Sequence, residues 1–335
     1  MGIETHWQRT GAVALVLSPL AAVFALVAAV RRALFALGVL RSVRLPVPVV
    51  VVGNITVGGT GKTPLVAWLA GELLARNRRP GIVTRGYGAR TRGPERVEPD
   101  SDPALVGDEA VLLARQCHCP VFRGADRVAA ARALLAAHPD TDVLLSDDGL
   151  QHYRLGRDLE IAVVDGMRGL GNGLPLPSGP LREPTARLAR CRFVVVKAPV
   201  RAALPPHPAR GAMQLDPGAL RSLTDPERTL PLGALAGLRV HAVAGIGNPD
   251  HFFDTLRSLG ITFEAHPFPD HHIWKARDLR FPGAQAVLMT VKDAVKCHAF
   301  AEPIFWELPV TARLDPHFAA ALLAAIPHGP RSKTA

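Results

Sequence analysis

A glycine-rich segment that follows a run of valines places the strongest constraint on how this chain folds. Residues 49–52 are consecutive valines, a composition typical of a buried parallel strand. The next residues, Gly53–Thr63, read GNITVGGTGKT, and Pro64 and a series of apolar residues follow them. Proline in the first turn is favourable for a helix, so we expect one to begin here. Strand, glycine loop and helix in this order predict a phosphate-binding loop.

The backbone and side-chain groups of this loop have distinct predicted roles in binding phosphate and Mg²⁺. Its backbone N–H groups would turn onto phosphate oxygens, Lys62 would reach the β- and γ-phosphates, and the Thr63 hydroxyl would ligate Mg²⁺. We therefore expect ATP and Mg²⁺ as cofactors. The predicted nucleotide-binding residues are Thr56, Val57, Gly58, Gly59, Thr60, Gly61, Lys62 and Thr63. One position departs from the usual pattern, which has glycine where this chain has Thr56.

A second strand-like run ends in two carboxylates. Val143–Ser146 is followed by Asp147, Asp148 and Gly149, and a parallel strand would present those carboxylates at the carboxyl edge of the sheet. In phosphoryl transfer, such an aspartate commonly holds the metal together with the loop Ser or Thr. Asp147 is the first choice for this role and Asp148 the second. The alternative is a solvated turn after the strand.

Further strand-like runs alternate with helical or loop segments. This alternation predicts a mainly parallel α/β sheet flanked by helices, of the P-loop NTPase kind. The segment Gly166–Pro184 is rich in Gly and Pro, contains Arg182, and is too long for a simple turn, so we expect a substrate or nucleotide loop. The additional predicted strands are Glu160–Asp165, Arg192–Lys197, Leu238–Ala244 and Ala286–Thr290.

The amino-terminal segment is apolar. The 21 residues 10–30 carry no charge, and as one helix they would reach across a bilayer core of about 30 Å. Ser18-Pro19 favours a break near Leu17 and a second helix to about Leu40, which suits two helices lying in the membrane interface. The alternatives are a spanning helix, a cleaved signal peptide and a buried core helix. Arginines 31, 32, 41 and 44 would face anionic headgroups and place the following domain on the cytoplasmic side.

Charge and cysteine content narrow the possible partners. The chain has 39 Lys+Arg against 29 Asp+Glu, a net charge of +10, which is compatible with nucleic acid, an anionic membrane or phosphorylated substrates. We expect no nucleic-acid partner, because the arginines are spread out with almost no aromatic residues between them. No obligate protein partner is evident. Cys117-His118-Cys119 is too tightly spaced for a structural zinc site.

Two further pairs of ionisable residues are ambiguous on their own. Asp108 and Glu109 precede the apolar segment Ala110–Arg115, and Asp270 and His271 lie in a proline-rich stretch. Both could place ionisable groups over an active site. Equally, acidic residues at a helix start are dipole partners, and histidines in loops are often polar surface.

Taken together, these motifs make the chain similar to the tetraacyldisaccharide 4′-kinases, the lipid A 4′-kinases of Gram-negative bacteria, over nearly its whole length. The loop and the DDGLQH segment at Asp147–His152 are the most specific. Two positions depart from the family pattern, His272 and Val291, which stand where an aromatic residue and Glu are usual. The other segments that carry the resemblance are Trp7 with Leu15–Leu20 and Arg31-Arg32, Arg85–Tyr87, Gly107–Glu109, Gly179–Pro184, Asp270-His271 and Thr290–Cys297.

The resemblance implies a reaction and roles for individual residues. It implies transfer of the ATP γ-phosphoryl group to the 4′-hydroxyl of a tetraacylated, lipid-linked glucosamine disaccharide 1-phosphate. By the family motifs, Asp108 would be the general base and His271 its partner. The remaining implied roles are Mg²⁺ binding by Asp147, Asp148 and Glu109, charge neutralisation by Lys62 and Arg182, and substrate contacts by Tyr87, Gln151 and His152.

The expected organisation has three parts. Residues 1–45 form membrane-associating helices, residues 46–205 a P-loop kinase lobe, and residues 206–335 a smaller lobe that completes the active-site cleft. The expected location is the cytoplasmic face of the bacterial inner membrane. Two other functions fit part of the sequence: a membrane-tethered P-loop ATPase that switches a protein partner, and a nucleic-acid-dependent ATPase.

Overall fold

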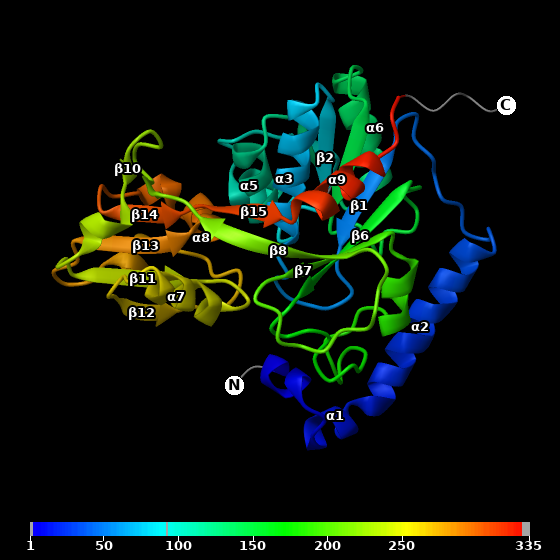
Figure 1. The fold of residues 1–335 in the computed structure, drawn as a ribbon, viewed down its shortest axis with the longest axis horizontal. Helices are drawn as coiled ribbons and strands as arrows, with labels where there is room; N and C mark the ends of the chain where they lie inside the picture. The colour runs from blue at the N-terminus through cyan, green and yellow to red at the C-terminus, as the bar shows by residue number, and fades with distance from the viewer. Residues whose placement is uncertain (1–2, 92, 330–335) are drawn as a thin grey trace.

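A computed structural model describes residues 3–91 and 93–329, which form two β-sheets with helices packed around them (Figure 1). The larger sheet has nine strands in the order β15-β8-β7-β6-β1-β5-β2-β4-β3. Its strands are β1 Val49–Gly53, β2 Pro80–Thr84, β3 Glu95–Val97, β4 Val121–Arg123, β5 Val143–Asp147, β6 Leu159–Asp165, β7 Phe193–Lys197, β8 Arg210–Pro217 and β15 Val310–Leu314.

The centre of this sheet is parallel and buried on both faces. All four valines of β1 are fully buried, as expected for a strand with helices on either side. Strand β1 pairs in parallel with β5 and β6, and Val52 lies opposite Asp147. The glycine loop after β1 and the two aspartates at the end of β5 therefore lie side by side at one edge of the sheet.

The smaller sheet has six strands in the order β10-β9-β14-β13-β11-β12. Four of them, β14, β13, β11 and β12, are parallel, and their carboxyl ends point toward the larger sheet (Figure 1). The strands are β9 Leu220–Ser222, β10 Thr229–Leu230, β11 Val240–Ala244, β12 Glu264–Pro267, β13 Ala286–Thr290 and β14 Phe305–Leu308.

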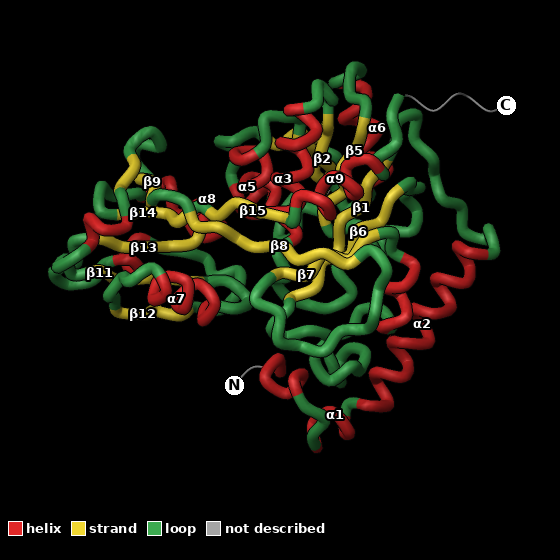
Figure 2. Tube along the Cα trace, viewed as in Figure 1, coloured by secondary structure: helices red, strands yellow, loops and turns green. Residues whose placement is uncertain are grey.

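The two sheets are joined by an antiparallel pair of strands. Strand β8 leads from the larger sheet to the smaller one, and β15 returns beside it, pairing Val310 with Pro217 and Leu314 with Met213; Figure 2 shows both crossings as strand. We call residues 41–217 together with 310–326 the first lobe and residues 218–309 the second lobe. This differs from the predicted division at residues 205 and 206, because the end of the chain returns to the edge of the first sheet.

Helices cover both lobes. Helix α3 follows the glycine loop, α5 begins at Asp108, and α8 follows β13 in the second lobe and contacts α5. The helices with their bounds are α1 Ala12–Val16, α2 Ser18–Ala36, α3 Lys62–Ala75, α4 Pro103–Val106, α5 Asp108–Gln116, α6 Arg127–Ala137, α7 Pro249–Ser258, α8 Val291–Cys297 and α9 Pro316–Ala324.

The amino-terminal helices lie along the outside of the first lobe (Figure 1). The predicted break is present, with α1 ending at Val16 and α2 beginning at Ser18, but α2 ends at Ala36 rather than near Leu40. Ser18 does not cap α2, because its hydroxyl donates to the Leu15 carbonyl. Helix α2 is long and apolar enough to cross a membrane, and only 6% of its apolar window is buried.

Most of the predicted framework is confirmed. Each of the six predicted strands is present, with ends that differ by at most two residues from the prediction, and the central sheet is parallel as expected. The other nine strands of the described residues were not predicted: β2, β3, β4, β8, β9, β10, β12, β14 and β15. Most of these are short or half exposed, so they lack the continuous apolar run that marked the predicted strands. Strands β2 and β14 are buried and were missed.

Candidate active site

The phosphate-binding loop has the backbone that its glycines predict. Gly58 and Gly61 have φ of 96° and 90°, a left-handed conformation that glycine adopts without strain. Helix α3 starts directly after Gly61, so its amino terminus faces the loop and would favour an anion there. The N–H of Val57 donates to the Pro180 carbonyl at 2.9 Å, which ties the loop to the Gly166–Pro184 segment.

Thr56 replaces the usual glycine without backbone strain. The backbone φ angle of Thr56 is not positive. It forms an antiparallel bridge with Leu181 and is buried. The loop therefore enters in an extended conformation that any residue can adopt, and this departure from the usual pattern leaves the loop intact.

Two aspartates at the end of β5 differ sharply in their surroundings. Asp148 lies 3.4 Å from the Lys62 ammonium and 3.1 Å from the Arg182 guanidinium. Burial alone would raise the pKa of Asp148, but Lys62 and Arg182 outweigh it and lower that pKa to about 2. For Asp147, burial and then the nearby Glu109 charge raise the pKa, since no cation touches its carboxylate in the part of the chain described.

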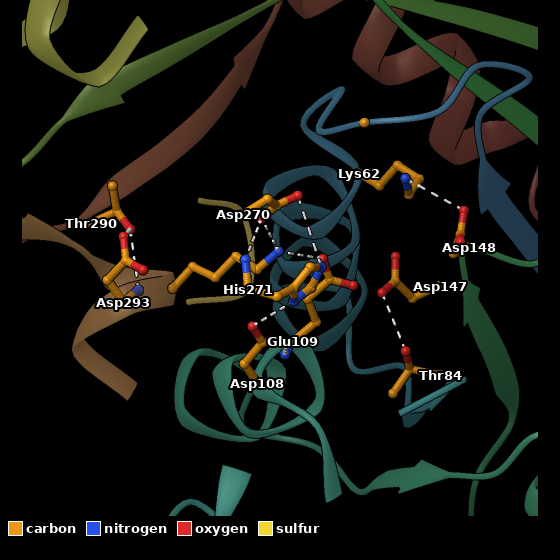
Figure 3. Close-up of polar contacts among 12 residues, drawn as sticks. Lys62, Thr84, Asp108, Glu109, Asp147, Asp148, Asp270, His271, Thr290 and Asp293 are labelled. Carbon is orange, nitrogen blue, oxygen red and sulfur yellow. Dashed lines mark hydrogen bonds and ion pairs between the residues drawn. The ribbon is translucent and has the colours of Figure 1, made fainter. Parts of the chain in front are cut away.

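These surroundings fit a divalent cation at Asp147. The Asp147 Oδ1 atom is buried and, within the described residues, has no hydrogen-bond partner. Its other oxygen accepts a long hydrogen bond from Thr84, at 3.4 Å. A buried carboxylate with an unused oxygen is costly by itself and becomes favourable when a cation binds it. Figure 3 shows Asp147 beside the Lys62–Asp148 pair.

Asp108 and His271 come from different lobes and meet. Asp108 starts α5 in the first lobe, His271 lies in the loop after β12 in the second, and His271 Nδ1 is 3.2 Å from Asp108 Oδ2. The hydrogen bond to Asp108 raises the pKa of His271. Burial would raise the pKa of Asp108, but the hydrogen bond from His271 and the nearby lysines lower it. Asp108 is therefore ionised at neutral pH and able to accept a proton.

Two lysines of α8 complete this junction; they lie in the Thr290–Cys297 segment that carries the family resemblance, but no role was predicted for either of them. Lys292 Nζ lies 3.1 Å from Glu109 and 3.7 Å from Asp270. Lys296 Nζ lies 3.9 Å from Asp108 and 3.1 Å from Asp293. Their spacing of four residues puts both on one face of the helix, which was the available signal in the sequence. Glu109, predicted as a metal ligand, is thus also the ion-pair partner of Lys292.

The second lobe also reaches the phosphate loop itself. A Cβ atom at Gly247 would lie 3.8 Å from the backbone nitrogen of Gly59 and 3.2 Å from the Asp270 carboxylate. Figure 3 shows Asp270 and His271 between Asp108 and Lys62. The predicted base, the predicted metal ligands and the loop lysine therefore gather where the two lobes meet.

The predicted substrate contacts differ in how accessible they are to a ligand. Tyr87 is exposed and its ring packs against that of His271, with centroids 5.0 Å apart. The Gln151 amide instead donates to the Asn54 carbonyl and to Glu183, each at 2.9 Å. Burial and then the charge of Arg127 lower the pKa of His152 to about 4. Gln151 is thus engaged within the protein, whereas Tyr87 is open to a ligand.

This arrangement suits in-line phosphoryl transfer. It combines a loop and helix terminus for polyphosphate, a lysine and an arginine for developing charge, a carboxylate for a cation, and an ionised carboxylate positioned by a histidine. Catalysis of this kind depends on positioning and electrostatics rather than on a covalent intermediate.

Comparisons with known proteins identify the family to which the chain is similar. The family model described as tetraacyldisaccharide-1-P 4′-kinase matches residues 13–327. The chain is 50% identical over 327 residues to the tetraacyldisaccharide 4′-kinase of Azoarcus sp. strain BH72, covering 97% of this chain and 95% of the relative. It is 56% identical over 301 residues to the enzyme of that name from Alkalilimnicola ehrlichii, covering 90% and 88%.

A solved structure is similar in fold. The crystal structure of LpxK from Aquifex aeolicus in complex with ATP superposes with a TM-score of 0.79 at 28% identity, and the match covers 93% of this chain and 98% of that one.

Proposed function

The chain belongs to the tetraacyldisaccharide 4′-kinase family, and we propose that it carries out the family reaction where its two lobes meet, at the cytoplasmic face of a membrane. The enzyme is a kinase: it transfers the γ-phosphoryl group of ATP to the 4′-hydroxyl of a tetraacylated disaccharide 1-phosphate, a step of lipid A biosynthesis. The observation that carries the site assignment is the Asp108–His271 contact of 3.2 Å between the lobes.

In the proposed step, the Asp108 carboxylate accepts the proton of the sugar 4′-hydroxyl. The hydroxyl oxygen bonds to the γ-phosphorus, the bond from that phosphorus to the β–γ bridging oxygen breaks, and ADP leaves. His271 is the positioning residue, because its Nδ1 holds Oδ2 of the carboxylate. The other oxygen, Oδ1, accepts a hydrogen bond from the Glu109 backbone N–H at 2.9 Å, and its second lone pair would face the substrate. Lys296, 3.9 Å from the same carboxylate, favours its ionised form.

The loop and its neighbours handle the charge of the phosphates. Lys62 would leave Asp148 for the β- and γ-phosphates, and Arg182, now paired with Asp148, would stabilise charge that develops during transfer. Asp147, Asp148 and Thr63 would hold Mg²⁺, with Glu109 close by, and the ion would supply positive charge to neutralise the phosphates. Tyr87, exposed beside His271, would contact the sugar, with Gln151 and His152 behind it.

The amino-terminal helices support a location on the membrane. Helix α2 carries a row of exposed apolar side chains that includes Leu20, Val23 and Val27, and α1 adds Leu15 and Val16. A substrate with acyl chains stays in the bilayer, since extraction costs about 0.8 kcal/mol per CH₂ group. An enzyme held in the interface meets its substrate there, and the exposed arginines after the apolar run, Arg31, Arg41 and Arg44, favour the anionic cytoplasmic leaflet. Arg32, also predicted to face headgroups, is instead half-buried and lies 3.9 Å from Glu183.

Neither alternative from the sequence is favoured by a separate observation. A switch ATPase has no use for a base such as Asp108 aimed at an acceptor hydroxyl, and the comparisons do not support that function. The two relatives described above are kinases by name.

The test is transfer of labelled γ-phosphate from Mg-ATP by detergent-solubilised protein, with and without the tetraacylated disaccharide 1-phosphate. Label should enter the lipid with wild-type protein and not with Lys62→Ala. Label released only as free phosphate, at a rate indifferent to the lipid, would contradict the kinase and restore the switch ATPase.

A further inference from the structure

A cluster of two histidines and a glutamate lies in the second lobe, outside the site described above. His241 is the second residue of β11, and Glu264 and His266 lie in the neighbouring strand β12. Strand β12 is the edge of the six-stranded sheet. The active site is reached from the carboxyl ends of these strands, so the cluster sits away from it.

The register of the two strands brings the three side chains to one face. His241 pairs with Glu264, and Val243 pairs with His266. Residues two apart in a strand point to the same side of a sheet, so Glu264 and His266 share the face of His241. Phe281 packs on both imidazole rings, with centroids 4.5 Å from His241 and 4.1 Å from His266, and so holds them in place.

The ligand atoms converge on one point. His241 Nδ1 is 3.0 Å from His266 Nε2. Glu264 Oε2 lies 3.6 Å from His241 Nδ1, and Glu264 Oε1 lies 3.8 Å from His266 Nε2. Ligands bound tetrahedrally at about 2.0–2.1 Å are about 3.3 Å apart. Each observed separation agrees with this to within about 0.5 Å. Across the described residues, this is the one group of three His, Cys, Asp or Glu side chains whose ligand atoms all lie within 4.8 Å of one another.

We propose that His241, Glu264 and His266 form a zinc-binding site at the edge of the second lobe. Two imidazoles and one carboxylate suit Zn²⁺, whereas Mg²⁺ prefers oxygen ligands alone. The Glu264 side chain is 69% exposed, so a water molecule has access to the fourth position.

Bound zinc would fasten the edge strand β12 to β11 and so stabilise the lobe that carries His271. The inference is independent of the kinase assignment, because none of the three residues takes part in the proposed reaction.

The test uses full-length protein in detergent with saturating Mg²⁺. Zinc chloride is added, unbound metal is removed by desalting, and retained zinc is counted by mass spectrometry; zinc-edge X-ray absorption then identifies the ligands. Wild-type protein should retain one zinc per chain, bound through two imidazoles, and its unfolding temperature should rise with zinc. The double variant E264Q/H266Q should bind zinc about 100-fold more weakly and lose this rise, with unchanged kinase activity.

Three further variants make the result specific. E264Q alone alters only an exposed side chain, so it should fold normally and still bind zinc more weakly. H317Q, at an exposed histidine, and C119S, in the Cys-His-Cys segment, should behave as wild type. Retention of zinc by E264Q/H266Q, loss of it in C119S, or no retention by wild type would overturn the proposal and leave a hydrogen-bonded histidine pair only.

Discussion

His271 Nδ1 lies 3.2 Å from Asp108 Oδ2. This contact links the start of helix α5 in the first lobe to the loop after β12 in the second lobe. The residues are separated by 163 positions in the sequence. Relative motion of the lobes would therefore change the distance between the proposed base and its partner, so the contact reports directly on whether the site is assembled.

The first prediction concerns the titration of this pair. The folded pKa of His271 is raised above 6.5, mainly by its hydrogen bond to Asp108. Its stabilising contribution is therefore complete below pH 6.5 and is lost as the pH rises through the raised value. For Asp108, whose pKa is lowered from 3.8, the contribution is complete above pH 3.8 and is lost as the pH falls through the lowered value.

These two pH dependences define the pH range in which the contribution of the pair to stability can be measured. The difference in unfolding free energy between wild type and His271→Gln should be largest between pH 3.8 and 6.5 and should shrink at higher pH. NMR of histidine-labelled protein should give His271 a pKa above 6.5, and Asp108→Asn should lower it. An unchanged His271 pKa in Asp108→Asn would show that the two side chains do not interact in solution.

The second prediction concerns Asp147→Asn in the absence of Mg²⁺. Burial and then the charge of Glu109 raise the pKa of Asp147, so its ionised form costs stability above that pKa, and the cost disappears as the pH falls through it. Removal of the charge should raise the unfolding temperature of Mg²⁺-free protein at pH 8, with a smaller gain at pH 5. Turnover with Mg-ATP should fall at least about 100-fold. A lower unfolding temperature at pH 8 would contradict the account.

The third prediction concerns Asp293, which holds α8 in place. Its fully buried carboxylate accepts hydrogen bonds from Thr290 Oγ1 at 2.7 Å, Gly245 N at 3.0 Å and Trp274 Nε1 at 3.1 Å. Asp293→Ala leaves these donors without their acceptor and Lys296 without its nearer carboxylate, so we expect a loss of about 3 kcal/mol in unfolding free energy. Denaturant unfolding measures it. The matched control is Asp254→Ala, at an exposed i,i+3 ion pair with Arg257, and should cost less than about 0.5 kcal/mol.

The fourth prediction concerns membrane binding. The side chains of Leu20, Val23 and Val27 on α2 are 61%, 60% and 62% exposed, so their replacement by serine should leave the unfolding temperature nearly unchanged. Each apolar side chain contributes about 1.5 kcal/mol or more when removed from water. Binding of the triple variant to anionic vesicles should therefore weaken by about 100-fold or more, as measured by vesicle flotation.

A control variant tests whether vesicle binding depends on α2 or on exposed apolar side chains anywhere on the surface. Leu105→Ser removes another exposed leucine, in α4 and away from the apolar helices. It should leave vesicle binding as in wild type. Equal weakening by both changes would assign membrane binding to the surface in general and remove α2 as the anchor.

The sequence predicted the parts of the fold that depend on local pattern. The valines of β1, the glycine loop and the aspartates after β5 are contiguous motifs, and parallel pairing of Val52 with Asp147 follows once both are central strands. The return of the chain through β15 to pair with β8 depends on contacts between residues about a hundred positions apart, and both strands are half exposed, so no local signal marked them.

The candidate site could be predicted from the sequence less completely than the central strands. Asp108 and His271 were ambiguous by themselves and were joined only through the family resemblance, because their contact depends on how the second lobe is placed. Lys292 and Lys296 were not singled out, since lysines on a helix are usually solvated. Gln151 was expected to face the substrate, yet its amide bonds Asn54 and Glu183, partners brought close by tertiary folding.

The most direct test of the account is a comparison of ATP binding with single-turnover transfer to the lipid in Asp108→Ala. If Asp108 is the base, the dissociation constant for Mg-ATP should stay within about twofold of wild type, while the transfer rate should fall by about 100-fold to 10,000-fold. A parallel loss of ATP affinity, or a transfer rate near that of wild type, would contradict the assignment of Asp108 as the group that accepts the proton.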